Sequence, residues 1–380
     1  MKTEYDAIVV GGGIVGASAG YHLARAGVDT LLVDRHDPGR ATSAGAGILA
    51  PEISGRDEAW FHFAVASVAY YSNLLPMLDA DGGGDTGYDQ CGLLLVAATE
   101  DERSPFTKTK ATIFQRQQER DTPSVDDLYE ISPGEAKELF PPLAHVLEAI
   151  YFRNAARVDG RLMESALRRA AAKHELATLA ASVESLLIEN GTIRGVRTTQ
   201  GTFHTQNVLI AGGAWSPALG QQLQVDLPVA PQRGQIAHLD LPNQETGKWP
   251  IVDAFHGHYI VCWPGRDGAG RVVVGATRET GSGYQSSTSV SGVIETMSEA
   301  LRVAPGLADA HLHEFRVGLR PYSADGLPFL GPVPGKVGAY IATGHGPTGL
   351  QLGPFSGKLM AELICGHPVD IDLHPFRIDR

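Results

Sequence analysis

The sequence predicts an α/β fold of two domains, the second of α+β type and built on a mostly antiparallel β-sheet. Three observations predict it. A glycine-rich turn joins an apolar run to a helix-like stretch near the N-terminus, residues 225–330 are rich in β-branched and aromatic segments separated by Pro and Gly, and a helical stretch over 353–365 closes the chain. Strands that alternate with helices favour parallel pairing, whereas strands separated by turns favour antiparallel pairing.

The N-terminal forty residues predict a strand, a tight turn, a helix and a second strand that ends at an acid, Asp34. Gly11 permits the tight turn, Gly13 allows a pyrophosphate to approach the backbone, and Gly16 allows the helix to pack closely on the sheet. The pyrophosphate would lie on the N–H groups of the helix N-terminus, and Asp34 would accept both ribose hydroxyls. These residues predict a Rossmann-type dinucleotide-binding domain, and a glycine turn without a ligand is the alternative.

The remaining elements follow from periodicity and turn residues. Helices are expected over 58–78, 107–120 and 161–173, and strands over 91–98 and 206–210, with a hairpin at Asn190-Gly191, a dipeptide that favours a type I′ turn. This order predicts two discontinuous domains. The dinucleotide-binding domain would comprise 1–80, 150–220 and 331–380, and the substrate-binding domain 81–149 and 221–330, inserted into it as two segments.

Composition excludes several classes of function. With a net charge of −12 over 380 residues, the chain lacks the basic surface that nucleic acid or an anionic membrane requires. No apolar run approaches the roughly 18 residues of a membrane-spanning helix, and the N-terminus leaves no room for a secretory signal. The three cysteines are far apart and lack CxxC spacing, which predicts neither disulfides nor a metal site and favours a cytoplasmic location.

Several segments in a fixed order resemble one family, the FAD-dependent oxidoreductases of the D-amino-acid oxidase superfamily. The glycine oxidase branch is the most similar, and sarcosine oxidases and D-amino-acid dehydrogenases are also similar. The segments that carry the resemblance span nearly the whole chain: Gly11–Gly16, Thr42-Ser43 with Gly47-Ile48-Leu49, Val158-Asp159-Gly160, Ala211–Ser216, Gly270–Thr277, Gly318–Pro321 with Asp325–Pro328, Gly344–Leu350 and Phe376–Arg380.

The resemblance implies FAD as cofactor, held non-covalently, since no cysteine lies near the expected flavin site. It also implies four groups of residues that contact the cofactor. They contact the pyrophosphate, the adenosine, the length of the dinucleotide up to the flavin ring, and the pyrimidine edge of that ring. These are Gly11, Gly13, Ile14, Val15 and Gly16 for the pyrophosphate; Asp34, Arg35 and Val183 for the adenosine; Thr42, Ser43, Gly47, Ile48, Leu49 and Gly212 along the dinucleotide; and His345, Gly346, Pro347, Thr348, Gly349, Leu350 and Gln351 for the pyrimidine edge.

The resemblance also implies substrate-binding residues. Arg320, in the Gly-Leu-Arg-Pro motif, would bind an amino-acid carboxylate, because a planar guanidinium donates two parallel hydrogen bonds to it. Tyr259 would assist Arg320, and His258 would share the pocket. Each residue also has a structural alternative. Arg320 could pair with a buried acid, Tyr259 could be a core aromatic, and His258 could be a structural histidine.

Two positions depart from glycine oxidases. Arg278 stands where they place Met, and Pro347 stands where they place Arg. The expected activity is oxidation of glycine, small D-amino acids or N-substituted glycines to an imine, then to a keto acid or glyoxylate, with oxygen reduced to hydrogen peroxide. The Arg278 departure is consistent with a larger substrate, such as an N-carboxymethyl amine, whose second polar or acidic group contacts Arg278, and equally with an Arg278 directed to solvent. A D-amino-acid dehydrogenase with another electron acceptor, a non-catalytic flavin-binding subunit and an NAD dehydrogenase also remain open, as does a homo-oligomer.

Overall fold

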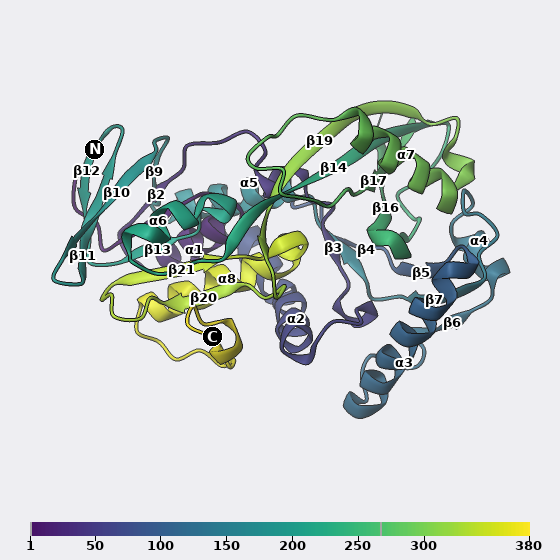
Figure 1. Cartoon of the computed structure of the whole chain (residues 1–380), viewed down its shortest axis with the longest axis horizontal. Helices are drawn as coiled ribbons and strands as arrows, with labels where there is room; N and C mark the ends of the chain where they lie inside the picture. The colour runs from purple at the N-terminus through teal and green to yellow at the C-terminus, as the bar shows by residue number, and fades with distance from the viewer. Residues whose placement is uncertain (1, 267) are drawn as a thin grey trace.

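The computed structural model describes residues 2–266 and 268–380, and these form an elongated molecule with two sheet-based lobes (Figure 1). In the first lobe a six-stranded sheet of the described chain runs in the order β20 (Phe329–Pro332), β21 (Ala339–Thr343), β13 (Val208–Ile210), β1 (Ala7–Val10), β2 (Thr30–Val33) and β9 (Ala177–Leu179). All pairs are parallel except β20–β21, which is antiparallel. This confirms the predicted parallel sheet.

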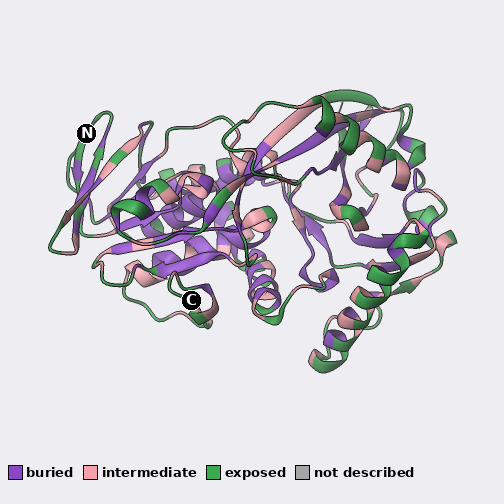
Figure 2. Ribbon diagram, in the orientation of Figure 1, coloured by how far each residue is buried: buried purple, intermediate pink, exposed green. Residues whose placement is uncertain are grey.

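The apolar runs of β1 and β2 are continuous because both faces of this sheet are covered. Val9 and Leu32 face a core shared with α1 (Ile14–Arg25), α2 (Glu58–Ala80), α5 (Gly160–Lys173) and α8 (Gly349–Ile364). Ile8 and Leu31 face the opposite core, shared with α6 (Pro217–Gln222) and a meander of β10 (Val183–Glu189), β11 (Thr192–Thr198) and β12 (Gly201–His204). Alternate side chains of a strand point to opposite faces, so each face receives half of the run. Figure 2 shows the resulting buried layer around α1, α8 and β21.

The second lobe is a nine-stranded, mostly antiparallel sheet of the described residues. Its order is β18 (Glu279–Thr280), β14 (Val229–Pro242), β17 (Ala269–Gly275), β16 (His258–Arg266), β15 (Ile251–Ala254), β5 (Leu93–Ala97), β7 (Glu148–Phe152) and β6 (Leu128–Ile131), with β19 (His311–Ser323) also on β14. The pair β5–β15 is parallel. Helices α3 (Arg103–Arg120), α4 (Pro133–Leu139) and α7 (Val290–Val303) flank this sheet, and short strands β3 (Ile48–Leu49), β8 (Ala156–Arg157) and β4 (Asp89–Gln90) form a third small sheet.

Several local predictions are confirmed. Asp159 caps α5 by accepting hydrogen bonds from the N–H groups of Arg161 and Leu162, at 2.8 and 3.1 Å. Asn190 and Gly191 both have positive φ (49° and 77°), as a type I′ turn requires, and they join β10 to β11. The division of the chain into two domains at particular residues stays a prediction.

Two local predictions were incomplete, although residues 225–330 do form the expected antiparallel strands. The expected strand-rich region contains α7, which begins after Ser289, whose side chain accepts a hydrogen bond from the N–H of Gly292 at 3.1 Å. The final helix begins at Gly349 rather than Gly353, although Pro354 lies inside it. Proline lacks the N–H that would bond to the Leu350 carbonyl, and the Tyr71 hydroxyl donates to that carbonyl instead, at 2.5 Å.

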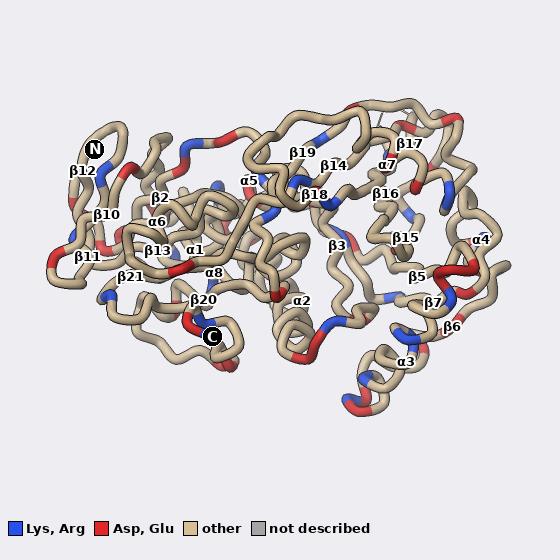
Figure 3. Tube along the Cα trace, viewed as in Figure 1, with Lys and Arg blue, Asp and Glu red and all other residues tan. Residues whose placement is uncertain are grey.

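Lys and Arg are interspersed with Asp and Glu along the trace rather than gathered in one region (Figure 3). No helix in the described ranges is both long enough and apolar enough to cross a membrane.

Candidate active site

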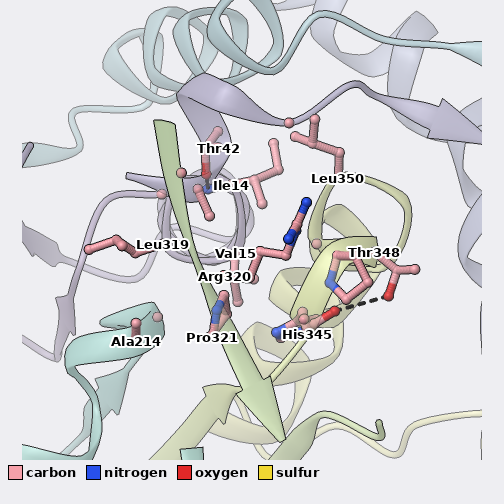
Figure 4. Close-up of a pocket in the computed structure, with 18 of the residues that line it drawn as sticks. Ile14, Val15, Thr42, Ala214, Leu319, Arg320, Pro321, His345, Thr348 and Leu350 are labelled. Carbon is pink, nitrogen blue, oxygen red and sulfur yellow. Dashed lines mark hydrogen bonds between the residues drawn. The ribbon is translucent and has the colours of Figure 1, made fainter. Parts of the chain in front are cut away.

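A cavity of about 880 Å³ lies between the two lobes and is lined by segments from both ends of the chain. It is at the upper end of the roughly 300–1,000 Å³ of ordinary ligand sites. Figure 4 shows that Ile14 and Thr42 line one side, His345 and Thr348 another, and that Arg320 reaches in from β19. The carboxyl ends of β1 and β2 open into it, which is where parallel α/β sheets bind ligands.

The glycine turn is packed too tightly for side chains. Gly11 has φ of +100°, and a Cβ there would lie 2.5 Å from the carbonyl oxygen of Ala211. A Cβ on Gly16 would collide with the carbonyl oxygen of Gly11, so Gly16 sets the packing of α1 on the sheet and does not itself line the cavity. The N–H of Ile14 donates to Thr42 Oγ1 at 3.0 Å, which ties the start of α1 to the segment after β2.

The acid at the end of β2 is held by two arginines that the sequence did not single out. Arg168, on α5, donates to Asp34 at 2.9 Å and to the carbonyl of Gly12 at 2.7 Å. Arg40 lies 3.4 Å from the same carboxylate and donates to the Gly12 carbonyl at 3.0 Å. Burial would raise the pKa of Asp34, but Arg40, His36 and Arg168 lower it, so the carboxylate is ionised at neutral pH. No local pattern identifies Arg168, because α5 meets β2 only in the folded chain.

The C-terminal wall of the cavity is the turn 345–348 and the start of α8. His345 Nε2 lies 2.9 Å from Ser356 Oγ, and burial lowers the pKa of His345 to about 4, so its ring is neutral at pH 7. Gln351 accepts a hydrogen bond from the N–H of Ala50 at 3.2 Å through its oxygen. Its Nε2 is buried with no hydrogen-bond partner among the described residues, although buried donors are normally paired. This unpaired donor indicates a ligand acceptor at this wall.

These features fit FAD. The backbone of Gly11–Val15 at the N-terminus of α1 can hold the pyrophosphate, the carboxylate of Asp34 can hold the ribose, and Gln351 can donate to a carbonyl of the flavin ring. Bound FAD supplies hydride acceptance, and the protein supplies position and electrostatics. None of the cysteines, which are unpaired, lines the cavity in the described chain, and a non-covalent attachment is therefore proposed.

Arg320 and Tyr259 lie close together in the cavity lining. Arg320 Nη1 donates to the carbonyl oxygen of Thr277 at 2.8 Å, and its guanidinium interacts with the Tyr259 hydroxyl. A Cβ on Gly234 would collide with this guanidinium, so the glycine makes room for it on β14. Burial is the main cause of a raised pKa for Tyr259, opposed by the positive charges of Arg320 and Arg278. Tyr259 therefore keeps its proton and can donate it to a carboxylate.

Arg278 also lines the cavity, on its exposed side. Its Nη1 donates to the carbonyl oxygen of Gly257 at 2.6 Å. The pKa of Arg320 is lowered, chiefly by burial. Repulsion from the positive charge of Arg278 lowers it further. The two guanidinium groups are therefore close enough for the charge of Arg278 to lower the pKa of Arg320.

His258 lies apart from this cavity. It is buried on the other face of β16, next to α7. Its Nε2 lies 3.6 Å from the carboxylate of Glu295 on that helix. Its Nδ1 contacts the carbonyl of His256 at 3.1 Å. Adjacent residues of a strand point to opposite faces, so Tyr259 and His258 cannot both reach the substrate. His258 is therefore left out of the proposed site.

Most of the predicted cofactor residues line the cavity, and three do not. The residues that line it are Gly11, Gly13, Ile14, Val15, Asp34, Arg35, Thr42, Gly47, Ile48, Val183, Gly212 and all of 345–351. Gly16, Ser43 and Leu49 are absent from its lining. Leu49 is fully buried, since it lies on β3 with its side chain in the core beside α2 and α8.

Comparisons with known proteins agree with this geometry. The family model for FAD-dependent oxidoreductases matches residues 6–363. The chain is 38% identical to an oxidoreductase of Bacillus subtilis, YurR, over 97% of each chain, and 30% identical to a glycine oxidase of Bacillus licheniformis over 100% of this chain and 98% of that one. The crystal structure of iminodiacetate oxidase from Chelativorans sp. BNC1 superposes with a TM-score of 0.91 at 36% identity, covering 98% of each chain. The chain therefore belongs to the FAD-dependent oxidoreductase family, as an enzyme of the amino-acid and amine oxidase type similar to glycine oxidases.

Proposed function

We propose that this enzyme oxidises N-carboxymethyl amines, secondary amines that carry two carboxylates, as iminodiacetate does. The observation that carries the proposal is the pair of guanidinium groups, Arg320 and Arg278, lining one cavity with the Tyr259 hydroxyl. Two cations that repel each other are both neutralised by a ligand with two carboxylates, and each charge-assisted hydrogen bond contributes about 1.5–3 kcal/mol. The likeness to iminodiacetate oxidase supports the same substrate class.

The residues assign an orientation to such a substrate. In the proposed orientation Arg320 and Tyr259 bind the carboxylate of the glycine unit that is oxidised, because they are less exposed than Arg278, and Arg278 binds the second carboxylate on the exposed side. With FAD bound, the α-carbon of the held glycine unit would give up a hydride to the flavin. Water then hydrolyses the resulting imine to glyoxylate and the primary amine, and oxygen accepts the electrons to give hydrogen peroxide. Holding the α-carbon in place supplies much of the rate.

Glycine, sarcosine and small D-amino acids form the second candidate class. The Arg320–Tyr259 pair suffices for a single carboxylate, and the glycine oxidase of B. licheniformis supports this class. In this case the Arg278 guanidinium stays on the Gly257 carbonyl and contacts no substrate. The two classes differ in whether the second carboxylate changes the rate.

Anaerobic reduction of the bound flavin distinguishes the classes. Iminodiacetate, sarcosine, glycine and D-alanine are each mixed with the oxidised holoenzyme without oxygen, and flavin bleaching is followed in time. We expect iminodiacetate to bleach the flavin at least tenfold faster than sarcosine at equal subsaturating concentration. Equal rates for the two amines would contradict the proposal. Hydrogen peroxide formed per turnover in air separates an oxidase from a dehydrogenase that uses another acceptor.

We also propose a cytoplasmic location, which the widely separated and unpaired cysteines support.

A further inference from the structure

Asp253 is an acidic residue of the cavity that neither the sequence pattern nor the resemblance singled out. It lies on β15 and is paired directly with Tyr259 on β16. Residues paired in an antiparallel ladder present their side chains on the same face, with Cβ atoms about 4.5–5.5 Å apart. Both residues line the cavity, together with Arg278 and Arg320. One carboxylate thus lines the same cavity as the two guanidinium groups, and it interacts electrostatically with Arg278 and with the Tyr259 hydroxyl.

The carboxylate of Asp253 has little to bind in the protein itself. It accepts a hydrogen bond from the backbone N–H of Ala254, and in the described part of the chain no side chain donates to it. Arg278 attracts it electrostatically, but the Arg278 guanidinium donates to the Gly257 carbonyl. A surface acid would have water as its partner, whereas this one faces the space that the substrate would fill.

The groups around Asp253 are few. Leu95 pairs with it from β5 and is apolar, and Thr109 of α3 is a neutral residue of the cavity lining. His256 also lines the cavity, but its ring contacts Asp101 and Glu299, at 3.0 and 3.4 Å. Burial raises the pKa of Asp253 to about 6, with Arg278 and the Ala254 N–H opposing the rise. The carboxylate is therefore ionised at neutral pH and is a stronger base than an ordinary aspartate.

We propose that Asp253 binds the protonated amine of the substrate and accepts its proton before hydride transfer. This role rests on the proposed oxidation of amines and identifies the group that recognises the nitrogen. A substrate with two carboxylates and one ammonium then meets two guanidinium groups and one carboxylate, so the charges of the cavity and the ligand match. Glycolates and other carboxylates without an amine lack the partner of Asp253 and are poorer ligands.

The proton step balances as follows. The ammonium N–H bond breaks and an O–H bond forms on Asp253, which leaves the electron pair on nitrogen. That pair forms the C=N bond as the α-carbon hydride leaves for the flavin, giving an iminium ion that water converts to glyoxylate and an ammonium product. Asp253 then returns its proton to water when the product leaves. Without a base in the site, the enzyme would have to await the small fraction of amine that is already neutral in solution.

The test compares two ligands that differ only at the nitrogen position, in the wild-type holoenzyme and in Asp253→Asn. Iminodiacetate has the amine, and diglycolate has an ether oxygen in its place. Stopped-flow flavin reduction gives the apparent Kd and limiting rate for iminodiacetate, and titration of the flavin absorbance gives the Kd for diglycolate. Asp240→Asn, at the far end of β14 beside His313, is the matched control.

We expect Asp253→Asn to weaken iminodiacetate binding and to slow its limiting reduction rate at pH 7 by tenfold or more each, while diglycolate binds as tightly as before or more tightly. In the wild type the rate rises through the pKa of Asp253. In the variant it rises only at alkaline pH, where the free amine loses its own proton. Equal losses for both ligands would show a structural role and overturn the proposal, as would an unchanged pH profile. If the Asn variant does not fold, Asp253→Ser replaces it in the same measurements.

Failure of the proposed substrate class is distinguishable from failure of this inference. If sarcosine reduces the flavin of the wild type and iminodiacetate does not, the proposed substrate class is wrong. The test of Asp253 then uses sarcosine and methoxyacetate, which again differ only at the nitrogen position. Asp253→Asn must then weaken the binding and slow the oxidation of sarcosine while leaving the Kd of methoxyacetate unchanged. If it does not, the inference also fails.

Discussion

The guanidinium of Arg278 lies directly on the backbone of Gly257, with Nη1 donating to the glycine carbonyl at 2.6 Å. A Cβ on Gly257 would occupy the space of Nη1 itself, and the φ of this glycine is +79°. Gly257 thus positions the cation whose place in the sequence departs from the glycine oxidase pattern. The position of Arg278 depends on two residues from separate segments, the turn before β16 and the loop between β17 and β18, and a change in either should alter substrate choice.

Replacing Gly257 by alanine should displace Arg278 from the cavity wall. We expect Gly257→Ala to raise the KM for iminodiacetate about tenfold or more and to leave the KM for sarcosine within about twofold, because only the second carboxylate loses its partner. Gly281→Ala is the control, since Gly281 has a similar φ of +83° and open space where the Cβ would lie. If both variants raise both KM values equally, backbone strain and not the seat of Arg278 explains the effect.

Replacing Arg320 by lysine keeps the charge and removes the planar pair of donors. We expect the KM for every amine substrate to rise by about ten- to a hundredfold, with FAD still bound, because two parallel hydrogen bonds to a carboxylate are lost. Steady-state kinetics and the flavin absorbance of the purified protein measure these two effects. Arg316→Lys, on the same strand and paired with Glu314, is the control. An unchanged KM in Arg320→Lys would remove this residue from the substrate site.

Replacing Asp34 by asparagine should weaken FAD binding. Asn cannot accept from the ribose hydroxyls as strongly as an ionised carboxylate, and it leaves Arg168 and Arg40 without their partner. We expect the Kd of FAD to rise about tenfold or more, measured by titrating the apoprotein and following flavin fluorescence. Asp29→Asn, at the opposite end of β2, is the control and should bind FAD normally. Equal affinities in the two variants would exclude Asp34 from the adenosine site.

Stability should fall in mild acid because of His238. Burial first, then Arg316, lowers its pKa to about 4, whereas the unfolded chain binds the proton near the ordinary value of about 6.5. The unfolded state therefore gains protons first as pH falls, and the free energy of unfolding drops between pH 6.5 and 4 by up to about 1.4 kcal/mol per pH unit from this residue. Urea unfolding at several pH values measures the slope.

His238→Gln should reduce that slope without abolishing it, since glutamine does not titrate whereas the buried His345, whose pKa is also lowered to about 4, still does. His313→Gln, at an exposed position of β19, should leave it unchanged. A slope that is the same in both variants and in the wild type would assign the acid sensitivity to other groups.

Much of the fold follows from local patterns. Glycine spacing and the two apolar strands identify the parallel sheet, because a tight turn and close helix packing leave no room for a Cβ at Gly11 or Gly16. The start of α8 was missed because Pro354 normally excludes a helix, and only the distant Tyr71 makes it tolerable. Helix α7 was missed because it carries exposed apolar residues, Val290 and Ile294, where a surface helix usually has polar ones.

A site residue could be predicted only where a single segment of sequence contains the motif that identifies it. Arg320 and the turn at 345–351 lie in recognisable motifs, and Arg278 is visible as a departure from the glycine oxidase pattern. Asp253 and Arg168 carry no such signal. Asp253 becomes a cavity residue through its pairing with Tyr259, and Arg168 reaches Asp34 across 134 positions of sequence. The tertiary pairing of elements creates both contacts, and no local spacing encodes them.

The central claim is that Arg278 recognises a second carboxylate. It is tested most directly by the ratio of kcat/KM for iminodiacetate to kcat/KM for sarcosine, measured in the wild type and in Arg278→Met. Loss of one charge-assisted interaction predicts that Arg278→Met lowers this ratio about tenfold or more, chiefly through iminodiacetate, while sarcosine is oxidised as before. A ratio that is unchanged by the substitution would contradict the account.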